Sequence, residues 1–323
     1  MGDDAVKKID KKKAVSWIGR ILMLASFVLI GTRILRYDID FSALASPFTA
    51  TGLVLAALVF GVSIFLTAFN FRWLIGVLSG VSVPHKLAIP IYCSSNLYKY
   101  LPGNIMHFVG RNRLAIEVKA LGHAEVAIAT VTDNLFLCLA AAIIAAICVF
   151  NYSVTYLRQI QIPPYVLAIA GAALLIFTLL AVLFRRKLAK WLKKYIEIIK
   201  GFRPAAAVKL LVVSAARLLA LTATYFMVLV LMGQTVTPGI VPEIIGLFVL
   251  SWVVGFLVPG APGGLGVREA ILIMFLGDTL DQNILVSSVV VHRVVCILGD
   301  MAAWGMSAIY AKWKGSRQTD MAA

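Results

Sequence analysis

Long apolar segments recur along the chain and are separated by short polar stretches. A run of about 18 or more apolar residues is long enough for an α-helix to cross the hydrocarbon of a bilayer. The segments predicted to cross on this criterion are 14–35, 51–71, 124–150, 164–184, 205–232 and 283–311. Two further stretches, about 87–118 and 240–280, are apolar but interrupted, so their path does not follow from length alone.

Composition supports the fold class that this pattern indicates. The chain has 323 residues, of which 61% are hydrophobic and only 14% are charged, and its mean hydropathy is +0.93. So few charges cannot cover a water-facing surface, which excludes a soluble globular protein. We predict an all-α polytopic membrane protein with six to eight transmembrane helices, forming a single domain over residues 1–323.

The basic residues indicate the orientation of that domain. The formal net charge is +15, and Lys and Arg of membrane proteins concentrate in cytoplasmic loops. The N-terminus (1–13), the linker 185–204 and the tail 312–323 are all basic and are expected in the cytoplasm. We therefore expect a bacterial-type inner membrane protein with both termini cytoplasmic, an uncleaved first helix and no nucleic-acid partner.

The linker has a pattern of its own. Residues 185–203 carry eight basic side chains and one acidic side chain, and their apolar residues recur at helical spacing. This pattern is typical of an amphipathic helix that lies on anionic lipid headgroups. An ordinary basic loop is the alternative. The expected partner of this segment is an anionic lipid surface.

The interrupted stretches admit two topologies. In the first, 87–118 enters and leaves from the cytoplasm and 240–280 enters and leaves from the outside, as two re-entrant hairpins. In the second, 240–258 and 266–282 each cross the membrane, which gives eight helices. The charge distribution is compatible with both.

The two interrupted stretches also resemble each other. Residues 98–111 read YKYLPGNIMHFVGR and residues 255–268 read GFLVPGAPGGLGVR. Each contains a Pro-Gly pair, seven further residues and an Arg. This match predicts an inverted repeat of 14–184 and 205–311, an arrangement in which transporters place the substrate site near the bilayer midplane.

The second interruption suits an anion-binding site. Irregular backbone at membrane depth survives only where it is buried in protein or lines a wet cavity. The half-helix that follows directs its positive dipole and free N–H groups into that space. Arg268 adds donors suited to phosphate, and Glu269 is placed to pair with an Arg. The candidate substrate-binding residues are Pro102, Gly103, Asn104, Arg111, Arg217, Gly263, Gly264, Gly266, Arg268, Glu269 and Arg293.

Further charges lie inside the predicted spans. A charge there costs at least ~2.5–3.5 kcal/mol on insertion scales, so it usually faces a partner or water. Arg293 and Asp300 are seven residues apart and are expected on one side of their helix. A carboxylate that only holds two helices together is the structural alternative. The candidates for proton or ion coupling are Asp133, His292 and Asp300. The scattered cysteines and the lack of a nucleotide motif predict neither a metal site nor a cofactor.

At KYLPGNIMHFVGR (99–111) and PGAPGGLGVRE (259–269) the sequence resembles the lysylphosphatidylglycerol synthase transmembrane family, whose flippase-like domains also occur as stand-alone proteins. The helix layout resembles this family over nearly the whole chain, and the second motif is the more specific part. The resemblance implies a membrane domain that moves a lipid between leaflets. The namesake members carry a cytoplasmic aminoacyl-transferase domain, which is not expected here, so lysyl transfer is not expected either. The resemblance to stand-alone members favours a polyprenyl-linked or other glycolipid.

Three functions compete at this point. The leading hypothesis is a flippase or scramblase for an anionic phospholipid or a polyprenyl-phosphate-linked (glyco)lipid. A secondary transporter of a small soluble anion would use the same charges in a closed aqueous path. A membrane-embedded lipid-modifying enzyme would need a nucleophile, a metal cluster or paired carboxylates, and the sequence offers only scattered polar residues, so no catalytic role is expected.

Overall fold

The structure is a computed structural model of the chain. The residues that it describes are 46–100, 106–156, 185–200, 202–257, 264, 267–277 and 279–320. The predicted spans 14–35 and 164–184 therefore lie outside the described residues. The same holds for five candidate site residues, Pro102, Gly103, Asn104, Gly263 and Gly266.

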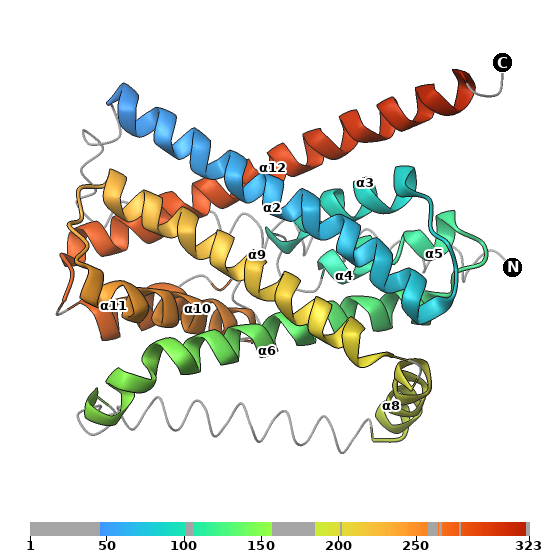
Figure 1. Cartoon of the computed structure of the whole chain (residues 1–323), viewed down its shortest axis with the longest axis horizontal. Coiled ribbons are helices and arrows are strands. Elements are labelled where there is room, and N and C mark those ends of the chain that lie inside the picture. The colour runs from blue at the N-terminus through green and yellow to red at the C-terminus, as the bar shows by residue number, and fades with distance from the viewer. Residues whose placement is uncertain are drawn as a thin grey trace, which may run out of the picture.

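The described part of the chain consists of helices joined by short loops and contains no strand (Figure 1). In chain order the helices are α2 (Pro47–Ser79), α3 (His85–Asn96), η2 (Leu97–Tyr100), α4 (Met106–Arg111), α5 (Leu114–Glu117), α6 (His123–Tyr156), α8 (Arg185–Ile199), α9 (Pro204–Leu231), η3 (Pro238–Ile240), α10 (Val241–Leu257), α11 (Val267–Leu276) and α12 (Gln282–Asp320).

Five of the described helical segments are long and apolar enough to cross a membrane. They are Pro47–Ser79, His123–Cys148, Pro204–Leu231, Pro238–Phe256 and Gln282–Trp313. Their outer faces expose large apolar side chains such as Leu55, Leu139 and Val212, which suits contact with lipid rather than water. The protein is thus an all-α integral membrane protein, and helices form at the four predicted spans that fall within the described residues.

Two helical hairpins enter the bundle from opposite ends (Figure 1). The hairpin of α3 and α4 starts at the end where α2 finishes, and the hairpin of α10 and α11 starts at the other end, where α9 finishes. With 10 residues, α11 spans about 15 Å, which is half of the roughly 30 Å of bilayer hydrocarbon. It is too short to cross alone, so the lengths favour the re-entrant topology for 240–280.

The helix contacts occur in matched pairs. In each hairpin the two arms pack together, α3 on α4 and α10 on α11. The long helix after each hairpin packs against its second arm, α6 on α4 and α12 on α11. That long helix also packs against the hairpin of the other half, α6 on α10 and α12 on α3. Finally, α2 contacts α12 and α9 contacts α6. Each of the two long helices α6 and α12 therefore contacts both hairpins.

The linker forms α8, which confirms the predicted helix. It contacts α2 and lies at the end of the bundle where α2 finishes and α9 begins (Figure 1). Its apolar side chains Leu192 and Ile196 are about half exposed, at 47% and 48%, alongside exposed Arg185, Lys190 and Lys193. A helix at the edge of the bundle with both kinds of exposed side chain has the character of an interfacial helix.

The crossing of α2 and α12 depends on two glycines. A Cβ atom on Gly299 would lie 2.7 Å from the Ala57 carbonyl oxygen, and one on Gly61 would lie 2.7 Å from the Gly299 carbonyl oxygen. Real Cβ atoms essentially never approach other atoms so closely. Small residues allow the two backbones to meet, as is common between transmembrane helices.

Replacing Gly299 by alanine is therefore expected to lower the stability of the protein by about 1–3 kcal/mol, because the added methyl group forces the helices apart. Gly305 on the same helix has no atom within 4 Å of its Cβ direction, so Gly305→Ala is expected to be neutral or slightly stabilising through helix propensity. Thermal unfolding of the two purified variants in detergent tests this pair. Equal stability of both would contradict the close crossing.

Candidate functional site

Buried charged side chains surround the tips of the two hairpins and form two groups. The first cluster lies between α3, α4, α6 and α9 and consists of Tyr92, Asn96, Arg111, Asp133 and Arg217. The second cluster lies between η2, α11 and α12 and consists of Lys99, Tyr100, Arg268, Glu269, Arg293 and Asp300.

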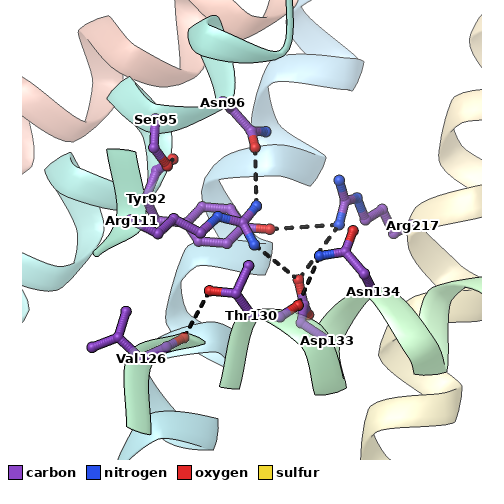
Figure 2. Close-up of polar contacts among 9 residues, drawn as sticks. All are labelled: Tyr92, Ser95, Asn96, Arg111, Val126, Thr130, Asp133, Asn134 and Arg217. Atoms are coloured by element: carbon purple, nitrogen blue, oxygen red, sulfur yellow. Dashed lines mark hydrogen bonds and ion pairs between the residues drawn. The ribbon is translucent and has the colours of Figure 1, made fainter. Parts of the chain in front are cut away.

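Asp133 is the centre of the first cluster (Figure 2). Its Oδ2 atom lies 3.5 Å from Nη1 of Arg111 and 4.0 Å from Nη1 of Arg217. Arg111 also donates from Nη2 to Oδ1 of Asn96 at 3.2 Å. One carboxylate from α6 thus serves two guanidinium groups, one from the first hairpin and one from α9, and the cluster has a surplus positive charge.

The two arginines of this cluster differ in their access to ligands. Arg111 is only 2% exposed, and its guanidinium lies 4.1 Å from the centre of the Tyr92 ring and 5.0 Å from that of Phe71. Arg217 donates to the Tyr92 hydroxyl at 3.5 Å and its side chain is 16% exposed. Arg111 is therefore enclosed by protein, and Arg217 is the member of the pair nearer to an opening.

The second cluster ties both hairpins to α12. Nη2 of Arg293 lies 2.8 Å from Oε1 of Glu269, which confirms the predicted pairing of Glu269 with an arginine. Asp300 is fully buried, and its Oδ2 atom lies 2.5 Å from Nζ of Lys99 and accepts a hydrogen bond of 2.6 Å from the Tyr100 hydroxyl. The first hairpin, through η2, and the second, through α11, thus meet on one helix.

Arg268 lies at the tip of the second hairpin. Its guanidinium is 5.7 Å from the centre of the Trp252 ring, and it forms no ion pair within the described part of the chain. Its buried Nε atom has no hydrogen-bond partner there. Arg268 is thus a guanidinium at the start of α11 without a carboxylate partner among the described residues.

Two glycines shape the backbone beside Arg268. Gly264 adopts a φ of 75°, which glycine tolerates far better than other residues. A Cβ atom there would lie 2.9 Å from both Nε of Arg268 and Cα of Gly255. The two arms of the hairpin therefore touch through backbone at this point, as expected for a tight turn that brings main chain next to the guanidinium.

His292 lies in an aromatic pocket and contacts no carboxylate among the described residues. Its Nε2 atom is 3.0 Å from the Thr224 hydroxyl, and its ring packs edge-on against Tyr225 and Phe248. It is fully buried. These contacts give His292 a packing role, and nothing in them tests the predicted part in proton or ion coupling.

The structure adds partners that the sequence did not identify. Arg293 and Asp300 share a helix, and Asp300 pairs with Lys99 and Tyr100, while Arg293 pairs with Glu269. Lys99 and Tyr100 were not among the candidates, although a lysine three residues before a Pro-Gly break in an apolar stretch is a usable signal. Within the described residues, no group of three His, Cys, Asp or Glu side chains is placed to hold a metal ion.

A groove lies on the outer side of the first hairpin. It has a volume of about 330 Å³ and is lined by Ser94, Tyr98, Met106, Val109, Gly110 and Arg113. Its walls include the well-exposed side chains of Tyr98 and Val109, at 42% and 61%. The groove therefore combines apolar walls with a cationic edge at Arg113.

In comparisons with known proteins, no protein-family model matches the chain, and no curated protein sequence matches it.

Proposed function

We propose that this protein is a lipid flippase or scramblase that moves a phosphate-bearing lipid between the two leaflets of the membrane. The lipid is an anionic phospholipid or a polyprenyl-phosphate-linked (glyco)lipid. The observation that carries the proposal is the cation-rich interior at the tips of two hairpins that enter from opposite ends of the bundle.

The chemistry of the interior suits a lipid phosphate. A charged headgroup crosses hydrocarbon only at great cost because it loses its hydration. Guanidinium groups replace that water with paired donors that match phosphate oxygens. Arg217 and Arg268 have donors that are not committed to a close ion pair among the described residues. The acyl chains stay in the surrounding lipid, against apolar surfaces such as the groove of the first hairpin.

The matched helix contacts support an inverted repeat. In both halves a hairpin is followed by a long helix, and an ion pair joins the second arm of the hairpin to that helix. The pairs are Arg111 with Asp133 in one half and Glu269 with Arg293 in the other. Opposed halves of this kind suit alternating access, with the substrate bound between the tips.

The basic end of the bundle supports an orientation. The helix α8 and the C-terminal end of α12 lie at the same end as the entrance of the first hairpin (Figure 1). The positive-inside rule places this end in the cytoplasm of a bacterial-type inner membrane. At this end the exposed Leu192 and Ile196 of α8 insert into the headgroup layer, and the Lys and Arg residues of α8 bind anionic lipid.

Replacing Arg268 by alanine tests the proposal. In vesicles reconstituted with the full chain and a fluorescent phosphate lipid, Arg268→Ala is expected to slow translocation about 10- to 100-fold, because it removes a charge-assisted hydrogen bond to the headgroup. Quenching the label in the outer leaflet measures the rate. Lys119→Ala, which removes an exposed cation outside both clusters and outside the groove, is the control and should leave the rate nearly unchanged.

Two results would contradict the proposal. One is wild-type protein that reconstitutes correctly but moves no phosphate lipid. The other is a folded Arg268→Ala protein that moves lipid at the wild-type rate. Uptake of a small anion by the same vesicles, without lipid movement, would instead favour a secondary anion transporter.

A further inference from the structure

The charges around the hairpin tips do not balance. The cationic side chains of the two clusters are Lys99, Arg111, Arg217, Arg268 and Arg293. The carboxylates are Asp133, Glu269 and Asp300. Five cations thus face three anions, and the two clusters together have an excess of two positive charges.

The close ion pairs identify the two surplus cations. Lys99 pairs with Asp300, Arg111 with Asp133, and Arg293 with Glu269. Arg217 is left with a share of Asp133 at 4.0 Å. Arg268 has no carboxylate within ion-pair distance among the described residues. Neither surplus cation is widely exposed to solvent.

The two clusters adjoin each other, so the excess belongs to one region. Asn96 of the first cluster ends α3, and Lys99 of the second cluster follows three residues later in η2. Arg268 is next to Glu269, whose partner Arg293 lies on the same helix as Asp300. A ligand that binds between the tips therefore experiences both surplus charges.

Four apolar segments outside or at the edge of the described residues add no acidic residue that could cancel this excess. The stretches 101–105 and 258–266 read LPGNI and VPGAPGGLG and contain no ionisable side chain. The segment 164–184 contains no Asp, Glu, Lys, Arg or His, and 14–35 contains two arginines and no acid. Because an uncompensated charge at membrane depth is costly, the missing negative charges are expected to come from the ligand.

We propose that the translocated headgroup carries two negative charges, as a phosphate monoester or a diphosphate does, rather than the single charge of a phosphodiester. This inference rests on the proposed lipid transport and specifies its substrate class. A phosphate monoester has a second pKa near 6 and so is close to a dianion at about pH 8.5. One such headgroup neutralises the excess, whereas a phosphodiester leaves one cation without a counter-charge.

Lipids with matched acyl chains and different headgroup charges test the inference. The probes are phosphatidate as the monoester, phosphatidylglycerol as the singly charged diester, phosphatidylcholine as the zwitterion, and inorganic phosphate as a soluble dianion. Binding to the purified full chain at about pH 8.5 is measured by native mass spectrometry, and transport is measured in vesicles. We expect phosphatidate to bind about 10- to 100-fold more tightly than phosphatidylglycerol, as one further charged hydrogen-bonding interaction implies.

Charge-changing variants make the test specific. Arg217→Gln and Arg268→Gln each lower the excess by one, so each is expected to reduce the preference for phosphatidate by about tenfold, the effect of one charged interaction. Arg217→Lys keeps the charge and should keep the preference. Lys119→Gln is the control outside the clusters and the groove. Native mass spectrometry reports folded protein only, and the two Gln variants test the inference independently of each other.

The outcomes separate this inference from the proposed function. Equal binding of phosphatidate and phosphatidylglycerol, unchanged in both Gln variants, overturns the dianion inference while lipid transport stands. Absence of movement for every lipid overturns the proposed function. Selective uptake of inorganic phosphate without lipid transport supports a dianion site but places it in a soluble-anion transporter.

Discussion

Replacing Asp133 by alanine is expected to destabilise the protein by about 3–5 kcal/mol, the cost of removing one partner from a buried ion pair. Arg111 is enclosed by protein, and its nearest carboxylate is Asp133 at 3.5 Å. Without that carboxylate the guanidinium stays buried between two aromatic rings with no counter-charge. Thermal or denaturant unfolding in detergent measures the loss.

The exposed pair Arg113–Glu117 is the matched control for this prediction. Its atoms lie 3.0 Å apart, closer than those of Arg111 and Asp133, but the side chains are 66% and 36% exposed. Exposed pairs contribute at most about 1 kcal/mol, so Glu117→Ala should have a small effect despite the shorter distance. The double change Arg111→Met with Asp133→Leu should recover much of the stability. Equal losses for Asp133→Ala and Glu117→Ala would show that burial does not set the cost.

Replacing Lys99 by methionine is the second change with a large expected effect. Asp300 has no exposed surface, and Lys99 provides its counter-charge at 2.5 Å. The substitution leaves a buried carboxylate with only the Tyr100 hydroxyl as a donor among the described residues, which again costs about 3–5 kcal/mol. We also expect slower lipid translocation, because this contact fixes the tip of the first hairpin to α12.

Variants around Lys99 separate charge from packing. Adding Asp300→Asn to Lys99→Met removes the stranded charge and should restore most of the stability. Lys209→Met is the control, since Lys209 is exposed over the Trp73 ring at 3.7 Å and such an exposed contact contributes about 0.5–1 kcal/mol. If the double variant is as unstable as Lys99→Met alone, the lost charge pairing is not the cause.

Much of the fold follows from apolar run length. The spans at 51–71 and 205–232 are found as helices because each is a continuous apolar run between polar ends. The path of 240–280 could not be predicted in this way. The apolar pattern does not show at which residue the helix after the Pro-Gly break begins, so its length stays open. Only the position of the start of α11 at Val267, and hence its 10-residue length, favours the hairpin.

The sequence indicated which charged residues belong to the site, but not which residue each of them pairs with. Glu269 was expected to pair with an arginine because it opens a half-helix at membrane depth, and it does so with Arg293. Asp300 was placed beside Arg293 by helical spacing, yet its partner comes from η2, on a segment 200 residues earlier. Helical periodicity predicts which side chains share a face, but it contains no information on which distant segment faces them.

That separation along the chain has a consequence for biosynthesis. Lys99 leaves the ribosome long before α12, which supplies Asp300, so the first hairpin cannot complete its charge pairing while it is being made. Until then its cationic tip is more stable in water or among headgroups than in hydrocarbon. Full insertion of the first hairpin must therefore follow the arrival of α12, so a helix of the second half completes the charge pairing of the first.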